Sequence, residues 1–205
     1  MSSEYNEATA KYYDLVLSPF LNPIRKKVAK TIKQLEVKNV IDLCCGTGHQ
    51  LKFLKKHGIT NITGVDLSPA MLQVAKEKNK IQDCIEGDAS KTPYDDNSFD
   101  LSMVSFALHE KPMEVAQAIV DEARRITVKD GYLLVVDYIH DEKAKKLGRM
   151  ATNWVEKMVG GEHYQNYLKY IKNKGWLTLF DKFELTNLDR FLYNSIGLFL
   201  FKVKK

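Results

Sequence analysis

The sequence has few cysteines, no long apolar run and little excess of one charge, and each shortage excludes a class of protein. Three cysteines among 205 residues, two of them adjacent, are too few for a disulfide framework. The longest apolar runs, such as 133–136 and 196–201, are far shorter than the roughly 20 residues that span a bilayer. The N-terminus, MSSEYNEATAKYYD, lacks the apolar core of a signal peptide. We therefore expect a cytoplasmic protein without a membrane span.

The excess of positive charge is also small. With 31 Lys and Arg against 26 Asp and Glu, the net charge is +5, which is low for a dedicated nucleic-acid binder. The basic residues between 25 and 38 alternate with apolar ones, which favours the solvated face of an amphipathic helix over a patch for an anionic partner. We expect no nucleic-acid partner.

Short apolar runs alternate with segments of helical period, which is typical of a parallel sheet with crossover helices in a single domain. The strands are predicted at 40–43, 62–65, 83–86, 99–106, 132–138, 183–191 and 196–203. The helices are predicted at 20–35, 49–56, 69–78 and 112–127, with a region that is helical throughout over 141–174. Tyr193-Asn194-Ser195 favours a tight turn, so the last two strands are predicted to pair as an antiparallel hairpin.

Glycines follow the first predicted strand, in Asp42-Leu-Cys-Cys-Gly-Thr-Gly48. Gly46 and Gly48 let the backbone approach a ligand and enter a helix whose free N–H groups point at it. A dinucleotide-binding fingerprint would place Gly or Ala at position 51, where Leu51 stands. The loop therefore predicts a nucleotide-like ligand and disfavours a nicotinamide dinucleotide.

Acidic residues follow the next two predicted strands. Asp66, about 20 positions beyond the glycine turn, is placed to accept hydrogen bonds from both hydroxyls of a ribose. The alternative is that Asp66 caps the following helix, although Ser68 is the better-placed cap. Asp88 could accept a hydrogen bond from an adenine amino group; in isolation, Gly87-Asp88 is only a turn.

Five motifs occur in the order and at the spacing of one family: Asp42-x-Cys-x-Gly-x-Gly, Val65-Asp66-Leu-Ser-Pro-x-Met, Gly87-Asp88-Ala, Ser98-Phe-Asp100 and Gly131-Tyr-Leu-Leu. Together they resemble the class I S-adenosylmethionine-dependent methyltransferases, and most of all the quinone-biosynthesis C-methyltransferases among those acting on small molecules. The resemblance covers about 36–138. It implies an α/β, Rossmann-like open sheet, mostly parallel with an antiparallel C-terminal hairpin strand, and with helices on both faces.

The resemblance also implies which residues contact the cofactor. They are Tyr13, Asp42, Cys44, Gly46, Gly48, Asp66, Leu67, Met71, Asp88, Ala89 and Ser105. Asp42 would orient the glycine loop and the methionyl amino group, Asp66 would hold the ribose, and Ser105 would end a strand near the sulfonium. Cys44 departs from the family, which has glycine there, and glycine adopts a positive φ more cheaply than cysteine.

The side of the site that would receive the methyl group is less well marked. His109 follows the fourth predicted strand, and it could be a base or an orienting donor with Glu110 tuning it, or it could bond to the backbone of the next helix. Tyr138, His163 and Tyr164 are the other candidates for substrate binding. The adjacent cysteines have no zinc-like spacing, so we expect no metal.

The single domain would thus comprise an N-terminal helical lid segment (1–35), a cofactor-binding core (36–138), a helical substrate-side insert (141–174) and a terminal hairpin (183–203). The stripe of Met150, Trp154, Met158, Tyr167 and Tyr170 is interpreted mostly as helix-packing faces. The predicted function is in-line methyl transfer from S-adenosylmethionine to a small, apolar or aromatic acceptor, by a monomer or homodimer. A cofactor-binding sensor or scaffold and a nicotinamide-dependent oxidoreductase remain as alternatives.

Overall fold

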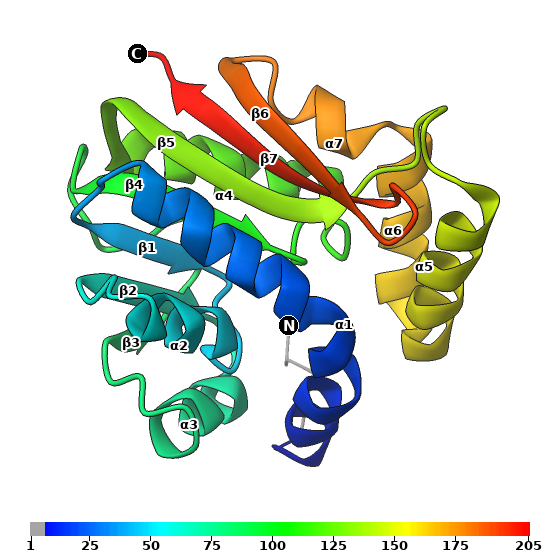
Figure 1. The fold of residues 1–205 in the computed structure, drawn as a ribbon, viewed down its shortest axis with the longest axis horizontal. Coiled ribbons are helices and arrows are strands. Elements are labelled where there is room, and N and C mark those ends of the chain that lie inside the picture. Colours follow the sequence, from blue (N-terminus) through cyan, green and yellow to red (C-terminus); the bar gives the residue numbers. More distant parts are fainter. Residues whose placement is uncertain (1–6) are drawn as a thin grey trace.

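The computed structural model describes the backbone of residues 7–205 and the side chains of residues 21–205 (Figure 1). Its strands are β1 (Val40–Leu43), β2 (Ile62–Asp66), β3 (Cys84–Glu86), β4 (Phe99–Ser105), β5 (Thr127–Tyr138), β6 (Phe183–Phe191) and β7 (Ile196–Val203). Its helices are α1 (Glu7–Gln34), α2 (His49–Lys56), α3 (Pro69–Glu77), α4 (Met113–Ile126), α5 (Lys146–Val159), α6 (Gly161–Lys172) and α7 (Gly175–Thr178).

The strands form one sheet in the order β3-β2-β1-β4-β5-β7-β6. From β3 to β5 the neighbouring strands are parallel, with Val40 of β1 opposite Ile62 of β2 and Leu101 of β4. The chain moves outward from β1 to β3 and then returns to the other side of β1 with β4, so the order reverses between β1 and β4. In open α/β sheets, ligands bind beyond the carboxyl ends of the strands at such a point.

The last two strands close the sheet as an antiparallel hairpin. β7 lies between β5 and β6, and Tyr138 of β5 is opposite Ile196 of β7. The connecting turn carries positive φ angles at Leu192, Tyr193 and Asn194. β7 is almost wholly buried, whereas much of the edge strand β6 is exposed. The predicted fold, mostly parallel with an antiparallel C-terminal hairpin, is confirmed.

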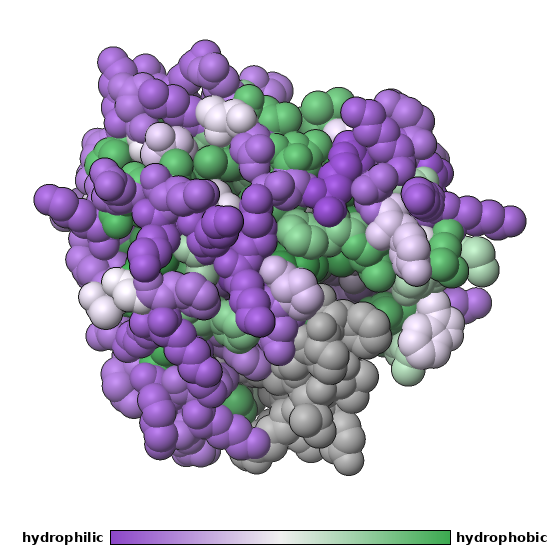
Figure 2. Space-filling view, in the orientation of Figure 1, coloured by the Kyte–Doolittle hydropathy of each residue, from purple (hydrophilic) through white to green (hydrophobic). Residues whose placement is uncertain are grey.

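Two apolar layers hold the helices against the sheet. On one face α1, α2 and α3 contribute Val28, Leu51 and Leu72 to one buried cluster; on the other, α4 contributes Ile119 and α6 contributes Tyr170 to a second. Figure 2 shows mainly hydrophilic side chains over the visible face, with apolar ones also reaching the surface near α5. Among the described residues, no helix is both long and apolar enough to cross a membrane.

Leu51 has a packing role that explains why it stands where a dinucleotide-binding loop would have glycine. It is fully buried beside Gly64 of β2, where an added Cβ would lie 3.0 Å from Leu51 Cδ1 and 2.7 Å from the sulfurs of Cys45 and Cys84. The two sulfurs are 3.9 Å apart, and all three cysteines are free thiols. Cys45 and Cys84 are therefore small packing residues, as the sequence indicated.

Three predicted elements need correction. The region 141–174 is not one helix: it divides at Gly160, whose φ of 73° is incompatible with a helix, into α5 and α6. The first helix begins at Glu7 instead of residue 20, and β5 begins at Thr127 instead of residue 132. The stripe on α5 is also not a packing face, because Met150, Trp154 and Met158 are each more than half exposed.

Candidate functional site

The loop from β1 to α2 uses the left-handed backbone conformation at every second residue. Cys44, Gly46 and Gly48 have φ angles of 66°, 53° and 68°. Cys44 therefore adopts the same left-handed conformation as the two glycines that follow it. A Cβ on Gly48 would press against Ala75 at 3.1 Å, whereas a Cβ on Gly46 would meet nothing within 4 Å. The open space lies beside Gly46, where the backbone leads into α2.

Two buried oxygens at these strand ends have no hydrogen-bond partner within the described part of the chain: Asp42 Oδ1 and Ser105 Oγ. Asp42 lies on β1, and only 2% of it is exposed to solvent. Burial raises the pKa of its carboxyl well above the usual value, and the nearby Cys84 and Asp66 add to that shift. Buried polar atoms are nearly always paired, so an unpaired carboxylate oxygen calls for a donor from a ligand. A methionyl ammonium group fits that requirement.

Asp66 is tied to the glycine loop. Its Oδ2 accepts the N–H of Gly46 at 2.7 Å and its Oδ1 accepts the N–H of Ser68 at 2.9 Å. Burial raises the pKa of Asp66, and these two backbone donors oppose that shift. Ser68, and not Asp66, caps α3, because its hydroxyl accepts the N–H of Met71. A carboxylate has about four acceptor positions, so two remain for ribose hydroxyls.

The residues expected around the adenine line the next strand ends. Leu67 is 60% exposed beside Asp66, Met71 is half-buried and Ala89 is buried. Asp88 is exposed, and its Oδ1 accepts both the N–H and the hydroxyl of Ser90. Tyr13 lies within α1, but its side chain is outside the described residues.

His109 lies in the loop after β4 and is held by Asp137 of β5. Its Nδ1 is 2.7 Å from Asp137 Oδ1, while Asp137 Oδ2 accepts the N–H groups of Leu108 and His109. Burial, the largest influence, would lower the pKa of His109, but Asp137 and then Glu156 raise it to about 10. The ring is 3% exposed, so its environment is set by these carboxylates.

His163 of α6 faces the carboxylate of Glu156 on α5, which also lies near His109. Its Nε2 lies 2.5 Å from Glu156 Oε2, and its Nδ1 lies 3.2 Å from Glu110 Oε2. Burial would lower the pKa of His163, but Glu110 and Glu156 raise it to about 9. Lys111 pairs with Glu110 Oε1 at 2.5 Å. We call His109, Glu110, Asp137, Glu156 and His163 the histidine–carboxylate cluster.

The structure brings together three of the four residues expected on the substrate side. Tyr138 donates its hydroxyl to Glu156 Oε1 at 2.6 Å, and its ring centroid is 4.6 Å from that of His109. Tyr164 points elsewhere, since its hydroxyl donates to Asn153 and its ring stacks on Tyr167.

Sequence reasoning missed Glu156 and paired the wrong carboxylate with His109. Glu110 was expected to tune His109, yet Asp137 orients that ring and Glu110 contacts His163. The position of Asp137 at the end of a strand was a usable signal. Glu156 gave none, because it sits within a helix among exposed residues.

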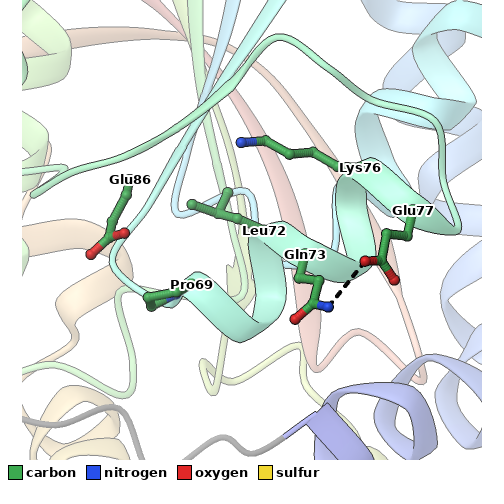
Figure 3. Close-up of a pocket in the computed structure, with 6 residues that line it drawn as sticks. All are labelled: Pro69, Leu72, Gln73, Lys76, Glu77 and Glu86. Atoms are coloured by element: carbon green, nitrogen blue, oxygen red, sulfur yellow. Dashed lines mark hydrogen bonds between the residues drawn. The ribbon is translucent and has the colours of Figure 1, made fainter.

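A surface depression lies along α3 and reaches Glu86 at the end of β3 (Figure 3). Its lining is Pro69, Leu72, Gln73, Lys76, Glu77 and Glu86. Gln73 donates a hydrogen bond to Glu77 along the helix, drawn as a dashed line. None of the groups at the ends of β1 and β4 contributes to it.

Comparison with known proteins supports the sequence resemblance. The family model described as "Methyltransferase domain" matches residues 41–135. A demethylmenaquinone methyltransferase of Thermotoga maritima is 30% identical over 142 residues, which are 67% of this chain and 61% of that protein. The ubiquinone/menaquinone biosynthesis C-methyltransferase UbiE of Campylobacter jejuni is 31% identical over 128 residues, 58% of this chain and 54% of that protein. The chain thus spans about three fifths or less of the length of these relatives.

Solved structures share the fold over most of the chain. A candidate methyltransferase of Bacillus halodurans C-125 is 28% identical, with a TM-score of 0.60 over 78% of this chain and 70% of that one. Human N-acetylserotonin methyltransferase, solved in complex with SAM, is 16% identical, with a TM-score of 0.66 over 98% of this chain and 57% of that one. The predicted resemblance to S-adenosylmethionine-dependent methyltransferases is therefore confirmed, with residues 41–135 matching the methyltransferase domain family.

Proposed function

We propose that the chain transfers a methyl group from S-adenosylmethionine to a small-molecule acceptor of the hydroquinone type. The observation that carries the cofactor part is the buried, unpartnered Oδ1 of Asp42 on β1, in the strand that leads into the loop with open space at Gly46. The acceptor class is supported by the relatives, which are named as methyltransferases of menaquinone and ubiquinone biosynthesis.

The strand ends supply the binding groups for such a cofactor. Asp42 would accept hydrogen bonds from the methionyl ammonium, and Asp66 would use its remaining acceptor positions for the ribose hydroxyls. Ser105, with its unpartnered hydroxyl, lies at the end of the neighbouring β4. When bound, S-adenosylmethionine supplies a methyl group that is already activated by a positively charged sulfur.

The acceptor side would act by positioning. Displacement at an activated methyl carbon needs the nucleophile held in line and water excluded. Both ring nitrogens of His109 face carboxylates, Asp137 and Glu156, so we assign His109 the task of organising the acceptor mouth and not of taking a proton from the acceptor. Phe106, which is half-buried and lies edge to face with the buried Tyr138 at 6.0 Å between centroids, provides aromatic surface for a planar ring.

Turnover tests this proposal directly. The purified chain is incubated with S-adenosylmethionine and a panel of hydroquinones, phenols, amines and thiols, and S-adenosylhomocysteine is measured by chromatography. We expect formation that depends on the hydroquinone. Gly46→Ala should lower the rate at subsaturating cofactor by about tenfold or more, because its methyl group enters the open space that the cofactor would fill.

Gly58→Ala is the matched control for this experiment. Gly58 also has a positive φ, of 85°, and its added Cβ would also meet nothing within 4 Å, but it lies in the loop between α2 and β2. Both variants carry a similar backbone strain of about 1–2 kcal/mol, so only the effect on the site differs. If the chain binds S-adenosylhomocysteine but produces no S-adenosylhomocysteine from S-adenosylmethionine with any acceptor, it is a cofactor-binding sensor and the proposal is wrong.

A further inference from the structure

Three potential metal ligands converge within the histidine–carboxylate cluster. His109 Nε2 is 3.5 Å and His163 Nε2 is 2.5 Å from the same oxygen, Glu156 Oε2. One ligand atom from each of the three residues lies within 4.8 Å of the others. Tetrahedral ligands at about 2.0–2.1 Å from an ion are about 3.3 Å apart, so small side-chain shifts would complete such a site.

Each imidazole is held from its other side by a further carboxylate. Asp137 contacts Nδ1 of His109 at 2.7 Å, and Glu110 contacts Nδ1 of His163 at 3.2 Å. A carboxylate on the far nitrogen fixes the tautomer that leaves the Nε2 lone pair for a metal, and metal-binding histidines nearly always have such a partner. Both Nε2 atoms are thereby directed at the same place, next to Glu156.

The charge of the cluster can be balanced in two ways, by protonated imidazoles or by a metal ion. Within the part of the chain whose side chains are described, three carboxylates, on Glu110, Asp137 and Glu156, face one ammonium group, that of Lys111. With neutral imidazoles the cluster therefore holds two uncompensated negative charges in a largely buried place, which is unfavourable. One divalent ion removes that excess. Protonation of both imidazoles is the competing way to remove it, and titration with a metal ion distinguishes the two.

We propose that His109, Glu156 and His163 bind a divalent transition-metal ion, with zinc as the best match. Two imidazoles and one carboxylate suit zinc and its first-row neighbours better than magnesium or calcium, which prefer oxygen ligands. Three protein ligands leave a tetrahedral ion one position for water or for an acceptor atom. The metal site is independent of the proposed methyl transfer, because it follows from side chains that need no cofactor.

Cobalt(II) titration tests the site without any turnover. Protein stripped with a chelator and dialysed is titrated with Co²⁺ and followed by visible absorption, and Zn²⁺ affinity is then measured by competition. We expect one ion per chain with the absorption of a tetrahedral N/O site. No thiolate-to-cobalt charge-transfer band should appear, because Cys44, Cys45 and Cys84 are not ligands. A thiolate band, or no binding, would overturn the proposal.

Variants locate the ion. His163→Ala and Glu156→Gln should weaken Zn²⁺ binding by about 100-fold or more, and Glu110→Gln by about tenfold. His140→Gln is the matched control, because His140 lies nearby, with its Nε2 2.9 Å from Thr152 Oγ1, but is outside the ligand set. The Zn²⁺ affinity of this variant should equal that of the wild type. Circular dichroism checks that each variant folds. Equal Zn²⁺ affinity in Glu110→Gln, Glu156→Gln and the wild type would contradict the site and leave imidazole protonation as the balancing charge.

Discussion

Cys44 occupies a backbone conformation that L-amino acids other than Asn and Asp seldom adopt. Its φ of 66° matches the left-handed angles of Gly46 and Gly48, so the loop has the same alternation at all three positions. The left-handed conformation brings the Cβ of a non-glycine residue close to the following carbonyl oxygen, at a cost of about 1–2 kcal/mol. The loop thus stores strain next to the unpartnered oxygen of Asp42, and strained residues often mark binding sites.

Replacing Cys44 tests that strain. Cys44→Gly should raise the free energy of unfolding by up to about 1 kcal/mol, because relief of the left-handed strain exceeds the extra entropy of glycine in the unfolded chain. Cys44→Val should lower it by about 1–2 kcal/mol, since a β-branched side chain tolerates this conformation worst. Urea unfolding of the three proteins gives the comparison. If Cys44→Gly is the least stable of them, the loop is not strained at this position.

Individual site residues differed in how far the sequence could predict them. Asp42 and Asp66 could be placed because each lies near the carboxyl end of a largely buried strand, and parallel strands present their carboxyl ends on one side of the sheet. Glu156 and His163 could not be placed together with His109. They meet through the packing of α5 and α6 beside the sheet, and no spacing in the sequence encodes that contact.

At the scale of elements, one ion pair fastens the segment that leads into α5. Arg190 of β6 donates from Nη1 and Nη2 to the two carboxylate oxygens of Asp141, at 3.0 and 2.6 Å. Arg149 of α5 adds a hydrogen bond from Nη2 to the backbone oxygen of Asp141. The hydrogen bonds of Arg190 lower the pKa of Asp141. Two-pronged pairs of this kind are stronger than ordinary surface ion pairs.

Asp141→Asn should therefore lower the free energy of unfolding by about 1–2 kcal/mol at pH 7. Because the folded-state pKa of Asp141 is depressed, its contribution is full above the unfolded value of about 3.9 and is lost as the pH falls through the folded value. The gap between wild type and variant should close below about pH 4. Asp121→Asn is the control, since Asp121 faces Lys182 in an exposed pair at 3.4 Å and should change little. A gap that persists unchanged to pH 2 would mean that the charge of Asp141 is not responsible.

Local sequence patterns predicted the bounds of helices and strands correctly where tertiary packing favoured the same conformation. β1, α2, β6 and β7 have the predicted bounds, because apolar period and turn residues coincide there. The first part of β5 was missed because Lys129 and Asp130 are exposed and polar, and pairing with β4 extends the strand regardless. The prediction that the apolar stripe of α5 packs against another element was wrong, because the stripe is exposed. Periodicity identifies an apolar face of a helix but does not show whether another element covers it.

At the scale of the whole molecule, the strand order assembles two neighbouring sets of groups. The reversal between β1 and β4 places the glycine loop, Asp66 and Ser105 at one edge of the sheet. The histidine–carboxylate cluster lies beyond the next strand ends, where β4 and β5 finish and α5 and α6 pack. The first set matches the proposed methyl donor, and the second lies where an acceptor would meet it.

The central claim, that the carboxyl ends of β1 and β2 bind S-adenosylmethionine, is tested most directly by calorimetric titration with S-adenosylhomocysteine. Asp66→Asn removes the charge that would hold the ribose. Asp100→Asn is the matched control, because Asp100 also accepts two backbone N–H groups, of Lys38 and Asn39, but at the amino ends of β1 and β4. We predict one site in the wild type, the same affinity in Asp100→Asn, a loss of about 10- to 100-fold in Asp66→Asn, and no binding of NADH. Unchanged affinity in Asp66→Asn, or binding of NADH in place of S-adenosylhomocysteine, would contradict the account.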